Sequence, residues 1–256
     1  MFYTVKLAIV IAATIVLSLV TILCGLFDAH GKRVYRINRL WTWLIVKFSG
    51  ITLTVEGLNR LDPQRQYLFV VNHQSNFDIP VLVQALPQFQ LRWIAKKELL
   101  RIPFFGWALW AAKHITVDRA DSLDALKSLK TAKQRMAAGI SVVVFPEGTR
   151  SLDGKLLPFK RGGFLLALKT KIPIVPVTIN GTGKLLGRGQ WRVQPGAVSI
   201  TIAAPIMTED FRPGGLRGLT AQVQEIIAEN LKTGEPSGAR QEIPTGAAVA
   251  SPGRTV

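Results

Sequence analysis

The sequence predicts an α/β fold in which helices cover a largely buried sheet, preceded by one membrane helix or by a two-helix hairpin. Three observations support this. From residue 51 onward, short runs rich in valine, isoleucine and aromatic residues alternate with helical patterns. Near the N-terminus, 21 consecutive residues from Leu7 to Phe27 carry no charge. Of the 256 residues, 48% are hydrophobic, which excludes a disordered protein and leaves room for one domain plus attachments.

The composition limits the chemistry that the chain can perform. One cysteine excludes a disulfide framework and any site with several thiolate ligands, and three histidines leave little material for a zinc cluster, so we expect no metal. The 32 Lys and Arg residues against 16 Asp and Glu residues give a formal charge of +16. This excess favours anionic partners such as phospholipid surfaces, phosphorylated substrates or nucleic acid.

The stretch from Leu7 to Phe27 is long enough for a transmembrane helix. At about 1.5 Å per residue it would span a hydrocarbon core of about 30 Å, whereas the apolar region of a signal peptide has only about 7–15 residues. Only Lys6 precedes the stretch, and more cations follow it. Those are Lys32, Arg33, Arg36, Arg39 and Lys47. The positive-inside rule therefore places the C-terminal side in the cytoplasm.

A second segment, Val34 to Phe48, mixes cations with tryptophans, which suits the headgroup layer of a membrane. We expect an interfacial helix there. Two helices dipping into one leaflet as a hairpin would explain the same residues, and the sequence does not separate this arrangement from a true span. Phe104 to Trp110 is a further apolar helix, which is either part of the core or a lip against the bilayer.

Seven strands are expected in the globular part. They are Ile51–Val55, Tyr67–Val71, Leu91–Ala95, His114–Val117, Ser141–Phe145, Ile172–Ile179 and Ala197–Ala203. The clearest helix is Ser122–Ala138, and Thr220–Lys232 is expected to be the closing helix. Thr233–Val256 is rich in small residues and proline without periodicity, which predicts a disordered tail. The expected division is membrane helices over 1–50, a globular domain over 51–232 and a tail over 233–256.

The first candidate site follows the expected strand that ends at Val71. A polar turn carries His73 and, five positions later, Asp78. An imidazole is the natural general base near neutral pH, and a carboxylate bonded to its other nitrogen fixes the tautomer. A substrate hydroxyl as nucleophile would make a catalytic serine or cysteine unnecessary. The alternative is that both residues decorate a turn, with Asp78 capping a helix that begins at Ile79.

The second candidate site is the turn Phe145-Pro146-Glu147-Gly148-Thr149-Arg150-Ser151, which also follows an apolar strand. Arg150 can bind a phosphate bidentately, and backbone N–H groups near Gly148 can assist. Lys160-Arg161-Gly162-Gly163 then opens a helix whose N-terminus favours anions. The alternative is an ordinary surface turn.

Four segments resemble, in order and approximate spacing, the four motifs of the glycerolipid acyltransferases. They are Asn72-His73 with Asp78, Val117-Asp118-Arg119, Phe145 to Ser151, and Ile174-Val175-Pro176-Val177. The chain is similar to the bacterial 1-acyl-sn-glycerol-3-phosphate acyltransferase family over roughly Thr52 to Glu209. The second motif departs from the pattern, because Lys113-His114-Ile115 precede it where relatives often carry a glycine. The resemblance implies a mixed sheet covered by helices and an acyltransferase domain over 51–232.

The resemblance also implies a role for individual residues. His73 would be the general base and Asp78 its orienting partner. The substrate-binding residues would be Lys96 or Lys97, Arg119, Glu147, Gly148, Thr149 and Arg150. His114 lies beside the second motif and would either approach the site or have a structural role.

The implied reaction transfers an acyl group from acyl-CoA or acyl-carrier protein to the sn-2 hydroxyl of lysophosphatidic acid, giving phosphatidic acid in phospholipid biosynthesis. It needs no cofactor and no covalent acyl-enzyme. Glycerol 3-phosphate or a lyso-ornithine lipid are alternative acceptors within the family. We expect the chain at the cell inner membrane, in contact with membrane phospholipids, with its catalytic domain on the cytoplasmic side. A basic membrane-tethered binding module is the alternative from another class, but the chain has no nucleic-acid-binding signature and we expect no nucleic-acid partner.

Overall fold

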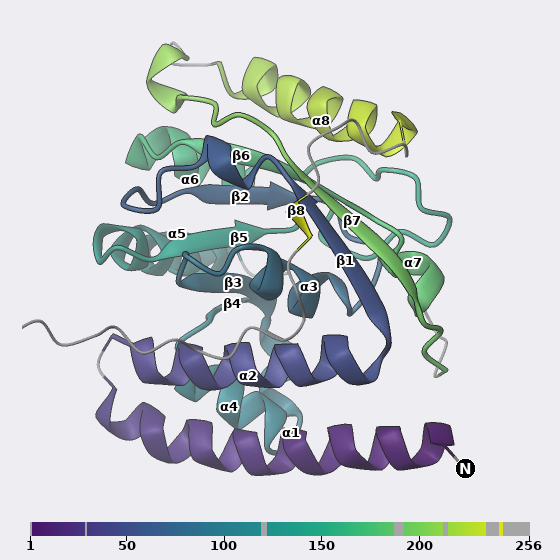
Figure 1. Ribbon diagram of the computed structural model, residues 1–256. Helices are drawn as coiled ribbons and strands as arrows, with labels where there is room; N and C mark the ends of the chain where they lie inside the picture. The colour runs from purple at the N-terminus through teal and green to yellow at the C-terminus, as the bar shows by residue number, and fades with distance from the viewer. Residues whose placement is uncertain are drawn as a thin grey trace, which may run out of the picture.

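The computed structural model of the chain describes residues 2–28, 30–118, 122–186, 192–211, 215–233 and 241–242. A central sheet carries helices on both faces, and two long N-terminal helices lie side by side at one end of the molecule (Figure 1). The sheet contains parallel and antiparallel pairs. The predicted α/β fold with a mixed sheet covered by helices is therefore confirmed.

Eight strands build this sheet. They are β1 Ile51–Glu56, β2 Leu68–Val71, β3 Leu91–Lys96, β4 Ile115–Val117, β5 Ser141–Val144, β6 Ile174–Asn180, β7 Gly196–Ile202 and β8 Gln241–Glu242. The first seven agree with the predicted strands to within two residues at each end. The eighth was not predicted: it lies in the expected disordered tail and pairs antiparallel with β1, whose outer edge offers unpaired backbone groups.

The strand order is β4-β3-β5-β2-β6-β7-β1-β8. The five strands from β4 to β6 are mutually parallel, and β7 runs antiparallel to β6. The carboxyl ends of the adjacent strands β5, β2 and β6 therefore meet at one edge of the sheet, which is where ligands bind in open parallel sheets. The loops that follow these three strands supply the candidate site.

Helices fill both faces of the sheet. They are α1 Phe2–Phe27, α2 Lys32–Phe48, α3 Asp78–Ala85, α4 Phe105–Ala111, α5 Ser122–Ala137, α6 Gly162–Thr170, α7 Thr182–Leu185 and α8 Leu216–Thr233. The closing helix α8 begins four residues before the predicted start. In β2 every side chain is buried: Phe69 and Val71 pack in the cluster that includes α2 and α3, while Leu68 and Val70 pack in the cluster that includes α5, α6 and α8. Burial on both faces explains why this strand reads as an unbroken apolar run.

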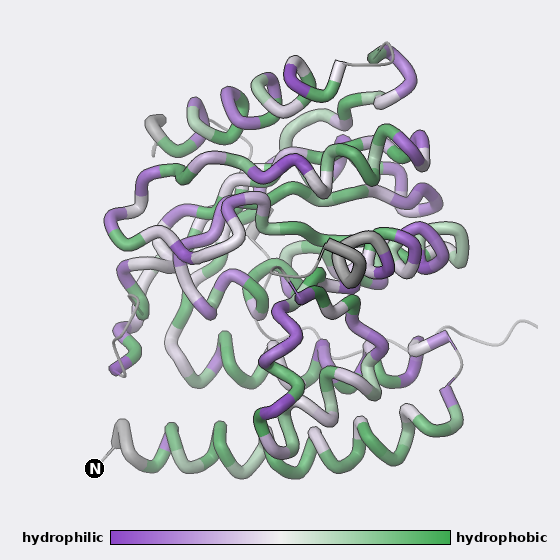
Figure 2. The backbone as a smooth tube through the Cα atoms, turned by 180° about the vertical axis from the view of Figure 1, so that it is seen from behind, coloured by the Kyte–Doolittle hydropathy of each residue, from purple (hydrophilic) through white to green (hydrophobic). Residues whose placement is uncertain are grey.

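The helices α1 and α4 form an apolar end of the molecule. α1 packs against both α2 and α4, and α4 is short. Figure 2 shows α1 as a hydrophobic helix along the outer edge. In α4, Trp107 and Trp110 are 53% and 66% exposed, whereas Phe105 lines an apolar cavity. Of the two readings of this helix, the exposed tryptophans favour an apolar lip over a core helix.

Candidate active site

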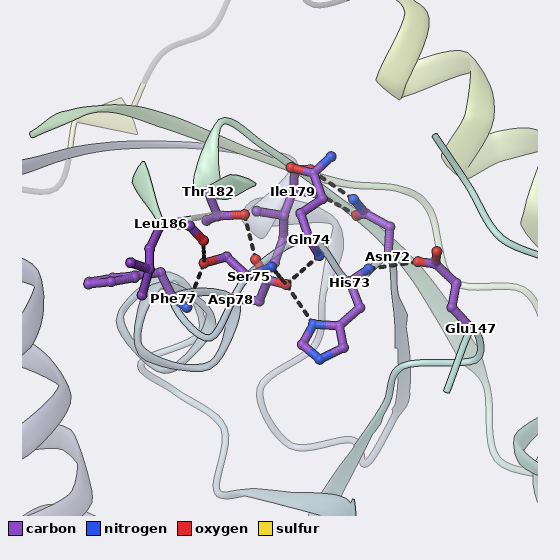
Figure 3. A network of polar contacts seen from close by, with 10 residues as sticks. All are labelled: Asn72, His73, Gln74, Ser75, Phe77, Asp78, Glu147, Ile179, Thr182 and Leu186. Atoms are coloured by element: carbon purple, nitrogen blue, oxygen red, sulfur yellow. Dashed lines mark hydrogen bonds and ion pairs between the residues drawn. The ribbon is translucent and has the colours of Figure 1, made fainter. Parts of the chain in front are cut away.

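His73 and Asp78 form a hydrogen-bonded pair directly after β2. The Nδ1 atom of His73 lies 2.7 Å from Oδ2 of Asp78. The Asp78 side chain is fully buried, whereas the His73 side chain is 18% exposed. Figure 3 shows the second ring nitrogen pointing away from the carboxylate, and Nε2 has no hydrogen-bond partner among the described residues. A carboxylate at Nδ1 holds the tautomer in which Nε2 can accept a proton.

The Asp78 carboxylate is held by donors on two sides. Its Oδ2 atom also accepts the backbone N–H groups of Gln74 at 2.7 Å and Ser75 at 2.9 Å. Its Oδ1 atom accepts the hydroxyl of Thr182, at the start of α7, at 2.5 Å. The carboxylate therefore serves the turn before α3 and does not cap that helix, which has no side-chain cap. The alternative reading of Asp78 as a helix cap is wrong.

The backbone of His73 is held by the loop that follows β5. Oε1 of Glu147 accepts the His73 N–H at 2.7 Å, and the His73 carbonyl accepts the N–H of Ser151 at 2.8 Å. Oε2 of Glu147 accepts the N–H of Leu157 at 2.9 Å. Burial raises the pKa of Glu147, while these two N–H groups oppose the rise. Both carboxylate oxygens thus bind backbone, so Glu147 positions His73, and its predicted contact with the substrate stays a prediction.

An aromatic stack fixes the plane of the imidazole. The His73 ring lies 4.1 Å from the Phe145 ring, centroid to centroid, with 17° between the planes. Phe145 in turn stacks on Trp93 of β3 at 6.2 Å and 6°. The stack removes rotational freedom from His73, so the Nε2 direction is set before any substrate binds.

Two further residues hold the loop after β2 and were not assigned roles from the sequence. The buried amide of Asn72 pairs with the backbone of Ile179 in both directions, at 2.9 and 2.7 Å. The hydroxyl of Ser75 donates to the carbonyl of Leu186 at 2.8 Å. Thr182 likewise was not predicted. The one feature of the sequence that points to Thr182 is its hydroxyl, which lies in the turn at Gly181 directly after a predicted strand.

The turn with Gly148, Thr149 and Arg150 lies at the protein surface beside this pair. Gly148 has φ +74°, and a Cβ there would lie 2.8 Å from Nζ of Lys160, so only glycine lets this lysine close over the turn. Arg150 is half-buried and Thr149 is exposed. The turn therefore presents cations next to the His73 loop, as a phosphate site requires.

The other predicted binding residues are Lys96, Lys97 and Arg119. Nζ of Lys96 pairs with Glu98 at 3.0 Å on the surface. Trp93 and Ala95 line the apolar cavity, so alternation along β3 turns the side chain of Lys96 to the opposite face of the sheet. No hydrogen bond joins Lys96 to the described residues of the site, and its predicted role stays a prediction. Lys97 is exposed, and its role stays a prediction. Arg119 lies outside the described residues.

A cavity of about 720 Å³ adjoins the site. Its walls come from α1, α2, the start of α3, β3 and α4, and its lining is mostly apolar. Asn76 and Phe77 connect it to the His73 turn, and Trp93 connects it to the aromatic stack. His114 also lines it. The backbone N–H of Trp93 donates to Nδ1 of His114 at 3.2 Å, which gives this histidine a structural contact.

The described residues include no group of three or more His, Cys, Asp or Glu side chains that could hold a metal ion. The arrangement offers a general base, a buried carboxylate behind it, cations beside it and an apolar cavity within reach. It suits the attack of a bound hydroxyl on an acyl group.

Comparisons with known proteins agree with this chemistry. Residues 52–180 match the family described as Acyltransferase. The chain is 31% identical over 195 residues to a 1-acyl-sn-glycerol-3-phosphate acyltransferase of Cocos nucifera, covering 76% of this chain and 61% of the relative. It is 33% identical over 201 residues to the alpha enzyme of that name in Ovis aries, covering 77% and 70%. The crystal structure of the 1-acyl-sn-glycerophosphate acyltransferase PlsC from Thermotoga maritima matches with a TM-score of 0.71 and 27% identity, covering 93% of this chain and all of that one.

Proposed function

Because the chain belongs to the acyltransferase family, we propose that it acylates the sn-2 hydroxyl of 1-acyl-sn-glycerol 3-phosphate and so makes phosphatidic acid. The relatives named above carry this activity in their names. The observation that carries the proposal is the hydrogen bond between His73 Nδ1 and the buried Asp78 carboxylate, with Nε2 directed away from it. The proposed reaction uses no cofactor.

The proposed step begins when His73 Nε2 takes the proton of the acceptor hydroxyl. The hydroxyl oxygen attacks the thioester carbonyl carbon and forms a tetrahedral oxyanion. The C–S bond then breaks, and the leaving thiolate takes the proton from the imidazolium. Asp78 stabilises that imidazolium through Nδ1, and general-base help of this kind contributes about 10²–10⁴ in rate.

The phosphate of the acceptor is proposed to bind at the Gly148 turn. Arg150 supplies a guanidinium that matches phosphate geometry, and Lys160 lies over the same turn. Glu147 contributes indirectly, because it ties this turn to the His73 backbone. A phosphate held here would fix which hydroxyl reaches Nε2.

The apolar cavity is proposed to hold an acyl chain, either of the thioester or of the acceptor. The donor is an acyl-CoA or an acyl-carrier protein; both present the same thioester. Because the cavity walls include α1, the proposed membrane anchor also forms part of the proposed acyl-chain site.

Membrane attachment is proposed through α1 and α4. Val5–Phe27 is the one helix among the described residues that is long and apolar enough to cross a membrane. It packs on α2 and α4, and its Phe27 is 85% exposed, as are large parts of Trp107 and Trp110 in α4. If α1 spanned the membrane, it would draw α4 and the cavity into the bilayer with it. We therefore favour a hairpin of α1 and α2 that enters one leaflet, and we place it at the cytoplasmic face of the inner membrane.

The test is acyl transfer by detergent-purified protein and its His73→Ala variant, given lysophosphatidic acid and labelled acyl-CoA. We expect phosphatidic acid from the wild type and a loss of at least about 10² in the variant. If the wild type makes no product from acyl-CoA, the assay is repeated with acyl-carrier protein as the donor. It is then repeated with glycerol 3-phosphate and with lyso-ornithine lipid as the acceptor. Equal turnover by both proteins would overturn the role of His73. Silence with every donor and acceptor would support a binding module.

A further inference from the structure

Three side chains of the globular part donate to the backbone that connects α1 to α2. Nε2 of Gln90 donates to the carbonyl of His30 at 2.9 Å, and Nη2 of Arg92 donates to the carbonyl of Gly31 at 3.1 Å. Nζ of Lys113 donates to the carbonyl of Asp28. We call Gln90, Arg92 and Lys113 the connection clamp. They come from the start of β3 and from the segment between α4 and β4.

Arg92 is unusual because it is 1% exposed and both its terminal nitrogens bind backbone carbonyls. Its guanidinium carbon lies 5.8 Å from the centre of the Tyr35 ring in α2. Gly31 makes this contact possible: it has φ +67°, and a Cβ on it would lie 2.2 Å from Nη2 of Arg92. Burying a charged arginine side chain costs free energy. We therefore look for a role of Arg92 beyond filling space in the core.

Lys113 reaches the end of α1 from a strained backbone. Its φ is +57°, in the left-handed region that favours glycine. Its ammonium binds the carbonyl that follows the last turn of α1, where a cation also complements the helix dipole. The carboxylate of Asp28 accepts the N–H groups of Arg33 and Val34 at 2.7 and 3.0 Å, so the same residue anchors the start of α2.

The clamp holds α1 where it closes the cavity. Next to it, Gly25 brings α1 so close to α4 that a Cβ would lie 2.9 Å from Cβ of Ala111. α1 supplies one wall of the cavity, with residues such as Leu7, Val10 and Leu17. The far wall includes Trp93, which follows Arg92 in β3. A change in the distance between α1 and β3 therefore changes the width of the cavity.

We propose that Gln90, Arg92 and Lys113 are positioning residues that set the width of the cavity and thereby the acyl-chain length that the protein accepts. This rests on the proposed function, in which the cavity holds an acyl chain. A rigid apolar pocket discriminates chains that differ by one methylene by roughly 10- to 200-fold. Loosening one wall lets longer chains fit and reduces that discrimination.

The test compares clamp variants with matched surface variants. Lys113→Met is compared with Lys133→Met, and Arg92→Met with Arg65→Met, because Lys133 and Arg65 are exposed and neither lines the cavity. Gly31→Ala displaces Arg92 from the other side of the contact. Gln90→Ala removes the exposed hydrogen bond to the His30 carbonyl. This variant is used if the other clamp variants do not fold. The kcat/KM is measured over a series of acyl-CoA donors at fixed acceptor, then over a series of lysophosphatidic acids at fixed donor.

We expect the ratio of kcat/KM between the preferred chain and the next longer even-numbered chain to fall about tenfold in the clamp variants and to stay unchanged in the surface variants. A fall in the donor series would show that the acyl chain of the acyl-CoA occupies the cavity. A fall in the acceptor series would show that the chain of the lysophosphatidic acid does. Equal loss with every chain in both series would show that the clamp only supports folding and would overturn the proposal.

Binding without turnover separates this proposal from the proposed function. Trp41 and Trp93 line the cavity, so their fluorescence reports an acyl chain bound inside it. If the wild type makes no phosphatidic acid, the titration of the same acyl-CoA and lysophosphatidic acid series still tests the clamp. A chain-length preference in binding that flattens in the clamp variants supports it; an identical preference in all variants contradicts it.

Discussion

The carboxylate of Glu147 accepts the backbone N–H of His73 at 2.7 Å, while its other oxygen accepts the N–H of Leu157. A buried carboxylate thus joins the loop after β2 to the loop after β5. The imidazole depends on this link, because the side chain of His73 can keep its direction only if its backbone is fixed. We therefore expect Glu147 to act on the proposed reaction through the position of His73.

Glu147→Gln should lower kcat more than it raises the KM of either substrate. The amide keeps one acceptor oxygen but turns its NH₂ group toward a backbone N–H that needs an acceptor. A buried donor left without a partner costs about 1–3 kcal/mol. Steady-state kinetics and thermal unfolding check both effects. A raised KM for the acceptor with unchanged kcat would instead place Glu147 at the phosphate.

The same variant tests a pH dependence of stability. Burial raises the pKa of Glu147 above its usual 4.5, against the two N–H groups that lower it, so the folded state holds its proton to higher pH than the unfolded state. The stability that this group contributes is complete below 4.5 and is lost as pH rises through the raised pKa. Denaturant unfolding across that range should show a falling trend in the wild type that is weaker in Glu147→Gln.

Much of the site could be predicted from the sequence because its signals are local. The run from Leu68 to Val71 predicts a buried strand, and the polar turn after it predicts the His73–Asp78 pair. Thr182 was missed, since its contact with Asp78 spans 104 positions and depends on the order of the strands. The backbone contacts of Glu147 were missed for a related reason: the sequence shows a charged residue in a loop but not that the loop folds over its carboxylate.

Asp78→Asn should lower kcat by about 10²–10⁴ with little effect on KM. An amide at this place can present its NH₂ group to Nδ1 and favour the wrong tautomer of His73. It also cannot accept the N–H groups of Gln74 and Ser75 as well as a carboxylate does. Single-turnover kinetics measure the chemical step directly. A wild-type kcat in Asp78→Asn would show that the hydrogen bond between Asp78 and His73 has no role in catalysis.

Thr182→Val should destabilise the site by about 1–3 kcal/mol, because it leaves Oδ1 of Asp78 buried without its donor. The side chain is fully buried and valine has nearly the same shape, so packing is kept. Thr182→Ser restores the hydroxyl and is the matched control. Unfolding curves and kcat are measured for both. Equal effects of Val and Ser would assign the loss to packing.

Arg150→Met should raise the KM for lysophosphatidic acid about tenfold or more, since a hydrogen bond between charged groups is worth roughly 1.5–3 kcal/mol. Arg150→Lys should recover only part of the affinity, because an ammonium cannot bind phosphate bidentately. The control is an acceptor without phosphate, monoacylglycerol, whose slow turnover should not change. A similar loss with both acceptors would argue against a phosphate contact.

His114→Asn should make the protein more resistant to acid. Burial, with help from the charge of Arg92, lowers the pKa of His114 from 6.5 to about 3, so this histidine protonates in the unfolded state long before it does in the folded state. Its contribution to stability is complete above 6.5 and is lost as pH falls toward 3. Asparagine offers an acceptor to the Trp93 N–H in place of Nδ1 but takes up no proton. Unfolding free energies at several pH values between 6.5 and 3 should fall less steeply in the variant than in the wild type. Identical slopes in the wild type and His114→Asn would show that the pKa of His114 is not lowered in the folded protein and would contradict this prediction.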